Sequence, residues 1–454
     1  MNRVAKRAGA VILLVVLLLA GLTFFVTEYV MQAADWAVFP GSPHVYYAGN
    51  MGIGAVTDRD GILLLDMNDQ REYSSSEAIR KSTLHWIGDE NGNISAPAVP
   101  NYSSQMVGFD LVNGLYSYGG AGNVAELTLS ASVQKTALEA LGSYKGTVAV
   151  YNYKTGQLLC AVTTPTYDPL NEPDLENDPE GRYEGVYMNR FTQSAYTPGS
   201  IFKIVTLAAA LEQIEGVEQM EFVCSGSQVY GVDQITCEDV HGTQSLKDAF
   251  CNSCNCAFAQ LSGLLGQQAL QDYVEKLRVT EPVSFDGITT VAGNYQAPAE
   301  PVNLAWSAIG QYTDLVNPCS FLTLMGAIAG GGEGAVPYVV EQVGNGLSGY
   351  QAKTQYTQRV MSTEVAQIVQ EYMRNNVLSK YGDDNFPGLT VCAKTGTGEM
   401  DGDRASNAMF AGFVTDAKYP LAFIVCVEEG GYGRATCVPI ASAVLTACKE
   451  VLDH

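Results

Sequence analysis

Residues 197–215 read TPGSIFKIVTLAAALEQIE, and this stretch predicts a helix that begins with a candidate nucleophile. Thr197 suits the N-cap position and the proline after it suits the first helical position, so we expect a helix over 198–215. Residues i and i+3 share a helix face, so the Lys203 amine can reach the Ser200 hydroxyl. In the first turn, free backbone N–H groups and the helix dipole favour negative charge that develops beside Ser200.

Two further motifs follow in the chain: Ser-Cys-Asn at 253–255, an S-x-N pattern, and Lys-Thr-Gly-Thr at 394–397, a K-T-G pattern. A serine hydroxyl is a weak nucleophile and needs a nearby base, and a lysine acts as a base only when it is neutral. Burial beside a second cation lowers the pKa of a lysine, and Lys394 is the candidate for that cation beside Lys203. The three motifs therefore indicate a serine acyl-transfer site.

The remaining motif residues have chemical roles that fit one cleft. Ser253 and Asn255 are two positions apart, so an extended loop can turn both toward a cleft, where Ser253 relays a proton and Asn255 holds a substrate amide. Gly396 lacks a side chain, so a peptide backbone can pair closely against the strand that carries Lys394. Thr397 can bind a carboxylate.

Chance occurrence is the competing interpretation, because each pattern is short. The chain contains a second K-T-G, at 154–156, between strand-like runs at 147–153 and 157–162. It precedes Ser200 and separates two strands, so we interpret it as a hairpin turn. A chance set in the right order, with apolar runs at the right places, is improbable, and we retain the catalytic interpretation.

The combination of S-x-x-K, S-x-N and K-T-G is the signature of β-lactamases and penicillin-binding proteins. Over most of its length the chain resembles a class B penicillin-binding protein, a monofunctional peptidoglycan D,D-transpeptidase. Three longer segments carry the resemblance: MNRFTQSAYTPGSIFK at 188–203, PTYDPL at 165–170 and DRDG at 58–61.

The resemblance implies a role for each motif residue. Ser200 would be the acylated serine, Lys203 its base and Ser253 the third catalytic residue, with the backbone N–H groups of Ser200 and Thr397 as the oxyanion hole. The substrate-binding residues would be Asn255, Lys394, Thr395, Gly396 and Thr397. The substrates would be peptidoglycan stem peptides ending in D-Ala-D-Ala, and β-lactams would inhibit. A polytopic glycosyltransferase is a candidate membrane partner, and no cofactor is implied.

Three positions depart from the family pattern. Ile53 stands where Arg is usual, Ser130 where Asp is usual, and Met409 where an aromatic residue is common. These positions belong to the N-terminal domain and the sheet, so they bear on the subfamily rather than on the chemistry.

The run from Ala8 to Val26 contains no charged residue and is long enough to cross the ~30 Å hydrocarbon core as a helix. Cations at 3, 6 and 7 precede it, so the positive-inside rule places the N-terminus in the cytoplasm and the remaining chain outside. A cleaved signal peptide is the alternative, but its apolar region would be shorter. We expect these divisions: a cytoplasmic tail at 1–7, a transmembrane helix at 8–27, an N-terminal pedestal domain at 28–120 and a transpeptidase domain at 121–454.

The apolar pattern predicts the fold of the large domain. Strands are expected at 147–153, 157–162, 389–397, 408–414 and 421–427, and a last helix over 440–452. The region from 245 to 380 has a mainly helical pattern. Strands at both ends of a domain with helices inserted between them predict an α+β fold, in which helices flank an antiparallel sheet.

Composition excludes some functions. A net charge of −23 argues against nucleic-acid binding, which depends on Lys and Arg facing phosphates. Eleven cysteines is an odd number, so at least one has no partner within the chain. Cys224 and Cys237 flank a polar, glycine-containing loop and are the disulfide candidates. The C-x2-C-x-C cluster at 251–256 fits no common zinc spacing and no histidine completes it, so we expect no metal site.

Two other functions use the same signature. A β-lactamase or D,D-carboxypeptidase would hydrolyse the acyl-enzyme, but the membrane segment and the additional N-terminal domain argue against both. A β-lactam sensor or a non-catalytic scaffold of a division or elongation complex is disfavoured by the single span and the intact motifs. Hydrolysis also needs a carboxylate near the ester: Glu212 lies roughly 18 Å along the helix from Ser200, and Glu399 is expected to be solvated.

Overall fold

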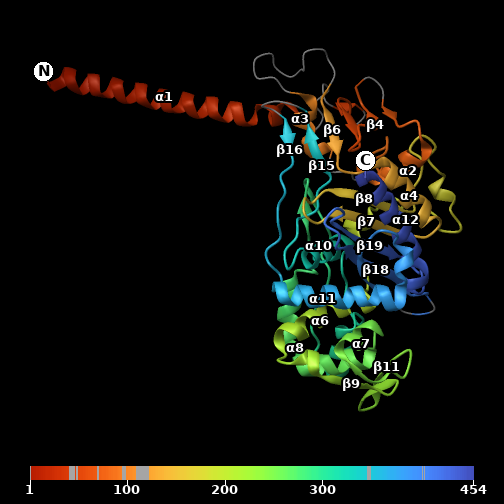
Figure 1. Ribbon diagram of the computed structural model, residues 1–454. Coiled ribbons are helices and arrows are strands. Elements are labelled where there is room, and N and C mark those ends of the chain that lie inside the picture. The colour runs from red at the N-terminus through yellow and green to blue at the C-terminus, as the bar shows by residue number, and fades with distance from the viewer. Residues whose placement is uncertain are drawn as a thin grey trace.

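The structure is a computed structural model, and it describes residues 2–39, 46–47, 50–68, 71–94, 99–108, 122–344, 349–400, 402 and 404–453. Helix α1 (Asn2–Ala37) projects away from the other elements (Figure 1). Its part from Arg3 to Ala33 is long and apolar enough to cross a membrane and is exposed along its apolar stretch, so it is a candidate membrane span, as expected. The C-terminal end of α1 packs against α3 (Ser103–Val107), where Ala33 and Val38 are buried.

A five-stranded antiparallel sheet lies at the centre of the large domain, in the order β17-β18-β19-β7-β8 (Figure 1). Its strands are β7 (Gly146–Asn152), β8 (Leu158–Thr164), β17 (Val391–Gly398), β18 (Asn407–Val414) and β19 (Leu421–Val427). The expected antiparallel sheet is confirmed. The K-T-G at 154–156 lies in the turn that joins β7 to β8, which confirms the hairpin interpretation.

Helices cover both faces of this sheet. They are α4 (Ala131–Leu141) and α12 (Gly433–Asp453) on one face and α10 (Pro318–Ala329) on the other. Successive side chains of a strand point to opposite faces, so Ala408 and Phe410 of β18 join the core with α4 and α12. Met409 and Ala411 join the core with α10. Burial on both faces explains why these strands read as continuous apolar runs.

The last helix begins earlier than expected, at Gly433 rather than at residue 440. Pro439 lies inside the helix, in its second turn. A β-carbon at Gly433 would lie 2.5 Å from the carbonyl oxygens of Gly396 and Met409, so glycine allows the helix start to approach the sheet. α12 also has the length and composition of a membrane span, but it packs on the sheet as a core helix.

Helices fill the region beside the edge strand β17, and most of them come from 245–380, where the sequence predicted a mainly helical region. They are α6 (Lys203–Gln213), α7 (Leu246–Cys251), α8 (Asn255–Leu277), α9 (Pro301–Ala308) and α11 (Thr363–Asn376). α6 packs against both α8 and α11, and α11 packs against β17. The helix that carries the first motif is therefore enclosed by other elements and cannot shift independently of them.

The expected helix over 198–215 begins differently in the structure. A 3₁₀ turn, η3 (Gly199–Phe202), comes first, and α6 continues from Lys203. The N-cap position is occupied by Pro198, not Thr197, and no side chain caps the turn. A tertiary contact replaces the cap, because the Gly199 N–H donates to the Gly310 carbonyl at 2.8 Å.

Two short β-ribbons form a lobe beside α8. Strand β9 (Glu221–Cys224) pairs with β12 (Gly242–Ser245), and β10 (Ser227–Tyr230) pairs with β11 (Asp233–Thr236). In Figure 1 this lobe lies at the opposite end of the molecule from α3.

A second sheet of six strands, in the order β16-β15-β6-β3-β4-β5, combines segments from distant parts of the chain. Its strands are β3 (Ala55–Thr57), β4 (Leu63–Asp66), β5 (Glu72–Tyr73), β6 (Val124–Leu127), β15 (Val340–Val343) and β16 (Tyr350–Gln351). β3 and β6 pair in parallel. The sheet joins strands from both sides of the expected boundary at residue 120, and the division into a pedestal at 28–120 and a domain at 121–454 stays a prediction.

Asp58 of the DRDG motif organises the junction between the two sheets. Its buried carboxylate accepts hydrogen bonds from the backbone N–H groups of Asp60 and Ile62 at 2.9 and 2.8 Å. It also accepts from the N–H of Ala131, the first residue of α4, at 2.9 Å. Ser130, the unusual residue at the N-cap of α4, makes no capping hydrogen bond with its side chain. Asp58 thus satisfies a helix N-terminus from another segment.

The remaining described elements are short or peripheral. They are β1 (Tyr46–Tyr47), β2 (Asn50–Met51), α2 (Glu77–Ile87), η1 (Pro100–Tyr102), η2 (Leu175–Asn177), α5 (Arg190–Gln193), η4 (Val217–Gln219), β13 (Ser284–Phe285), β14 (Ile288–Thr289), η6 (Val377–Tyr381) and η7 (Asp383–Asn385).

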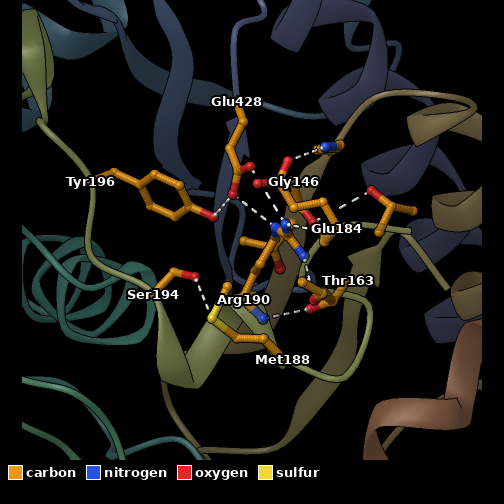
Figure 2. A network of polar contacts seen from close by, with 12 residues as sticks. Gly146, Thr163, Glu184, Met188, Arg190, Ser194, Tyr196 and Glu428 are labelled. Carbon is orange, nitrogen blue, oxygen red and sulfur yellow. Dashed lines mark hydrogen bonds and ion pairs between the residues drawn. The ribbon is translucent and has the colours of Figure 1, made fainter. Parts of the chain in front are cut away.

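The segment that leads to the first motif is held by an ion pair between Arg190 of α5 and Glu428, just after β19 (Figure 2). Arg190 Nε lies 2.7 Å from Glu428 Oε1, and the arginine side chain is only 3% exposed. The Tyr196 hydroxyl donates to the same carboxylate oxygen at 3.0 Å. Further guanidinium hydrogen bonds go to the carbonyls of Glu184 and Gly185. One carboxylate thereby fixes the chain on both sides of α5.

We predict that Glu428→Gln destabilises the protein by about 1–3 kcal/mol, because it leaves the buried Arg190 charge without its counter-ion. The matched control is Glu184→Gln, which removes a well-exposed partner of Lys145 and should change stability by less than about 1 kcal/mol. Urea unfolding of the detergent-solubilised chain measures both. Equal effects of the two variants would contradict the importance assigned to the Arg190–Glu428 pair.

Candidate active site

The three motifs meet in one cleft of about 970 Å³. Ser200, Ser253, Asn255, Thr395 and Thr397 all line it. Ser200 lies half-buried in the η3 turn, and Lys203 follows as the first residue of α6. The structure therefore brings together residues that are up to two hundred positions apart in the chain, as the sequence predicted.

Lys203 is fully buried and its amine contacts four oxygen atoms. Nζ lies 3.0 Å from Ser200 Oγ and 3.1 Å from Ser253 Oγ. It also donates to the Ser253 carbonyl at 2.6 Å and to Asn255 Oδ1 at 2.7 Å. A neutral amine has two N–H donors and one lone pair. The two carbonyl oxygens can take both donors, which leaves the lone pair free to accept the Ser200 proton.

Ser253 bridges the two lysines of the site. Its hydroxyl lies 3.1 Å from Lys203 Nζ and 2.9 Å from Lys394 Nζ. The residue has a φ of 52°, in the left-handed region, and not the extended backbone that the sequence suggested. This turn between α7 and α8 directs both the hydroxyl and the carbonyl of Ser253 toward Lys203.

Asn255 begins α8 and is held at both ends of its amide. Oδ1 accepts from Lys203, and Nδ2 donates to the carbonyl of Thr236 at 2.9 Å. Thr236 belongs to the lobe, so Asn255 connects the Lys203 amine to that lobe. A substrate amide that bonds to Asn255 must compete with these contacts.

Burial dominates the electrostatics of the two lysines. Lys203 and Lys394 are both buried, and among the described residues neither has a carboxylate oxygen within 4.0 Å. Loss of solvation lowers the pKa of Lys203 to about 8. Loss of solvation and the Lys203 charge hold the pKa of Lys394 well below its usual range. Both shifts make a neutral amine easier to form in this site than at an exposed lysine.

Strand β17 approaches the Ser200 turn so closely that glycines are needed on both sides. Gly199 has a φ of +54°, and a β-carbon there would lie 2.2 Å from the Thr397 carbonyl oxygen. A β-carbon at Gly396 would lie 2.6 Å from the Pro198 carbonyl oxygen. These contacts set the position of Ser200 relative to the strand edge.

One edge of β17 pairs with β18. On the other, outer edge, every second residue directs its backbone N–H and C=O groups away from β18. The carbonyls of Val391 and Ala393 accept from Arg374 and Asn376 on this edge. Further along the same edge, the Thr395 N–H donates to the Tyr381 hydroxyl at 3.0 Å, and the Thr397 carbonyl accepts from Gln311 at 3.1 Å. The alternation places the Thr397 N–H on this edge too, where the oxyanion-hole hypothesis requires it.

Sequence reasoning missed several residues that support the site. The Tyr381 hydroxyl contacts both the backbone N–H and the hydroxyl of Thr395. Gln311 donates to the Thr397 carbonyl at the end of β17. Asn376, fully buried, donates to the Ala393 carbonyl at 3.0 Å. No short pattern marks these residues, since each lies outside the three motifs in a helix or loop whose approach to β17 depends on the tertiary fold.

The cysteines predicted as a disulfide lie near the site but are unbridged in the structure. Cys224 and Cys237 are free thiols whose sulfur atoms lie within 4.8 Å of each other. His241 Nδ1 or Nε2 and Cys254 Sγ also lie within 4.8 Å of both sulfur atoms, an arrangement that the spacing of the cysteines had not indicated.

The comparisons with known proteins agree with this geometry. The penicillin binding protein transpeptidase domain matches residues 146–446, and the chain therefore belongs to this family of serine acyl-transfer enzymes, as a class B penicillin-binding protein. It is 28% identical over 359 residues to the peptidoglycan D,D-transpeptidase PbpA of Mycobacterium tuberculosis, which covers 72% of this chain and 73% of that protein.

Solved structures share the fold. The D,D-transpeptidase domain of a peptidoglycan glycosyltransferase from Eggerthella lenta has a TM-score of 0.73 and 25% identity, covering 88% of this chain and 98% of that one. The imipenem acyl-enzyme of penicillin-binding protein A from M. tuberculosis has a TM-score of 0.74 and 23% identity, covering 87% and 98%. A third, penicillin-binding protein PBP2 of Helicobacter pylori in complex with MreC, has a TM-score of 0.65 and 20% identity, covering 74% and 66%.

Proposed function

We propose that this chain is a peptidoglycan D,D-transpeptidase in which Ser200 forms an acyl-enzyme with the stem peptide. The observation that carries this proposal is the buried Lys203 amine, which lies 3.0 Å from Ser200 Oγ and has no carboxylate partner within salt-bridge distance among the described residues. Such an amine is a base that is already desolvated before substrate arrives. The names of curated relatives, peptidoglycan D,D-transpeptidases, support the same activity.

In the acylation half-reaction, Lys203 takes the Ser200 proton as Oγ attacks the penultimate D-Ala carbonyl carbon. The backbone N–H groups of Ser200 and Thr397 receive the oxyanion. The proton passes through the Ser253 hydroxyl, which contacts both lysines, to the leaving amine. The peptide C–N bond breaks, terminal D-Ala departs, and an ester to Ser200 remains.

In the second half-reaction, an amine of a neighbouring stem peptide attacks the ester carbonyl. Lys203, neutral again, takes the proton that the attacking nitrogen loses, and Ser200 recovers a proton as its C–O bond breaks. Thr395 and Thr397 line the cleft beside Lys394, so they suit a substrate carboxylate. An extended peptide would pair with the end of the outer edge of β17, at Thr397, where it would compete with the Gln311 contact.

Hydrolysis is the competing fate of the acyl-enzyme, and the carboxylates of the site do not favour it. Glu212 is bound by Tyr273 and Lys276 on α8, at the far part of α6 from Ser200. Glu399 lines the cleft but is exposed beyond the end of β17. Neither is placed to aim a water at the ester, which disfavours a β-lactamase or D,D-carboxypeptidase.

The membrane topology is part of the proposal. With α1 as the anchor, Arg3, Lys6 and Arg7 would stay on the cytoplasmic side, and the cleft would face the extracytoplasmic side, where stem peptides are cross-linked. The proposed divisions remain 1–7, 8–27, 28–120 and 121–454. An exposed apolar helix could also contact a polytopic glycosyltransferase in the membrane.

We predict that fluorescent penicillin labels one residue, Ser200. Ser200→Ala should abolish labelling, and Lys203→Ala should slow it by at least about 10²-fold, the usual loss for a catalytic proton-transfer group. Lys154→Ala, in the hairpin K-T-G, is the matched control and should label normally. Gel fluorescence with peptide mapping measures this, and full labelling of Ser200→Ala would refute the assignment.

The rate of acylation should increase about tenfold per pH unit below pH 8 and level off above it. The reason is that the base must be neutral, and the pKa of Lys203 is lowered to about 8 mainly by burial. The thiols of Cys237, Cys254 and Cys256 and the Glu238 carboxylate act in the opposite direction. Stopped-flow acylation between pH 6 and 9 measures the profile, with Lys154→Ala as the control. A rate that does not change over this range would contradict the role of Lys203.

A chromogenic β-lactam should give a burst of about one equivalent, followed by very slow turnover. The expectation follows from the positions of Glu212, at the far part of α6, and of Glu399, exposed beyond the end of β17. Absorbance after rapid mixing measures the burst and the steady rate. Sustained turnover at many cycles per second would instead favour the β-lactamase alternative.

A further inference from the structure

Four side chains of the metal-ligand type converge behind the second motif. Cys224 ends β9, Cys237 follows β11, His241 precedes β12, and Cys254 is the N-cap residue of α8. Their sulfur and imidazole nitrogen atoms all lie within 4.8 Å of one another. Three strand ends and a helix start thus point to a single position.

From this geometry we infer that Cys224, Cys237, His241 and Cys254 form a zinc site of the Cys₃His type. Tetrahedral zinc, with Zn–S near 2.3 Å and Zn–N near 2.0–2.1 Å, places sulfur and nitrogen ligands about 3.6 Å apart and two sulfurs about 3.8 Å apart. The structure has 3.5 Å between Cys237 Sγ and His241 Nδ1 and 3.9 Å between Cys237 Sγ and Cys254 Sγ. Both distances match the edges of such a tetrahedron.

The surroundings suit thiolate ligands. Cys224 and Cys254 are buried, so water does not compete for them. Cys254 Sγ accepts a hydrogen bond from the Ala257 N–H at 3.4 Å in the first turn of α8, where the helix dipole favours a negative sulfur. Soft thiolates with one imidazole select zinc over magnesium or calcium. On binding, three thiols release their protons to solvent and no electrons are transferred.

The lobe also has a structural need for the ion. Its two ribbons are each of only two strands, and such hairpins are marginally stable in water by themselves. Val229 and Val232 are exposed, so the ribbon of β10 and β11 buries little apolar surface of its own. A metal ion that joins β9, β11, β12 and α8 would stabilise this lobe, whose apolar core is small.

The site adjoins the catalytic cleft, and its expected effect on acylation rests on the proposed function. Cys254 lies between Ser253 and Asn255, and Cys237 lines the cleft. An ion on Cys254 would fix the turn that directs Ser253 and Asn255 toward Lys203. Zinc would therefore position the second motif without contacting substrate, and its removal should slow acylation of Ser200.

The first test is metal content of the full chain, purified in detergent with a reductant and measured by inductively coupled plasma mass spectrometry. We expect about one zinc per chain, and at least a fivefold loss in Cys237→Ser and in His241→Gln. Cys251→Ser is the matched control, because Cys251 lies three residues before Cys254 but outside the four, and it should retain the zinc. Cobalt(II) in place of zinc should give thiolate charge-transfer absorption in the wild type that Cys237→Ser lacks.

Three results would overturn the site: no zinc after equilibration with zinc under reductant, zinc content that the ligand variants do not change, or a Cys224–Cys237 disulfide in the chain as isolated. If the variants fail to fold, the wild type still decides, since 1,10-phenanthroline should lower its Tm and added zinc should restore it. An unchanged Tm with zinc removed would overturn the structural role.

Penicillin labelling before and after chelation tests the positioning role. Slower labelling that zinc restores supports it, and an unchanged rate with zinc removed overturns it. If Ser200 is not labelled at all, the proposed function fails while the metal measurement remains valid, so the two failures are distinguishable.

Discussion

Two lysine side chains buried around one serine hydroxyl are the constraint on which the rest of the structure depends. An ammonium ion without a carboxylate is costly to desolvate, so Lys203 and Lys394 remain inside the protein only if the fold encloses them and supplies oxygen atoms. Three elements meet that requirement: α6 brings Lys203, β17 brings Lys394, and the turn before α8 brings the Ser253 hydroxyl between them. The same burial that destabilises the charged forms produces a base suited to acyl transfer.

The surrounding architecture keeps these three elements in register. β17 is the edge of a sheet whose two faces are both covered, so the strand cannot tilt without disturbing two cores. The Ser200 turn packs so close to this strand that Gly199 and Gly396 have no space for a β-carbon. The Arg190–Glu428 ion pair ties the chain before that turn to the end of β19. Rigidity of this kind is what a preorganised oxyanion hole requires.

Much of this was accessible from the sequence, for physical reasons that are specific to each element. The i, i+3 spacing of Ser200 and Lys203 and the apolar runs of the central sheet are local patterns, and the structure shows them as expected. The 3₁₀ start of the first-motif helix was not accessible, because a contact with Gly310 replaces the cap. The parallel pairing of β3 with β6 joins segments far apart in the chain. The approach of Tyr381 to Thr395 depends on how η6 packs beside β17, and no short pattern encodes either contact. His241 escaped notice because its partners come from two separate strand ends and a helix start.

The packing of α1 against α3 has a mechanical consequence. With the helix in a bilayer, the domain is not suspended on a slack tether, since Ala33 and Val38 are already buried at the junction. The cleft is then held at a nearly constant distance from the bilayer surface. Such an enzyme surveys a thin layer of new wall parallel to the membrane and gains access to other layers only when the anchor tilts or its neighbours move it.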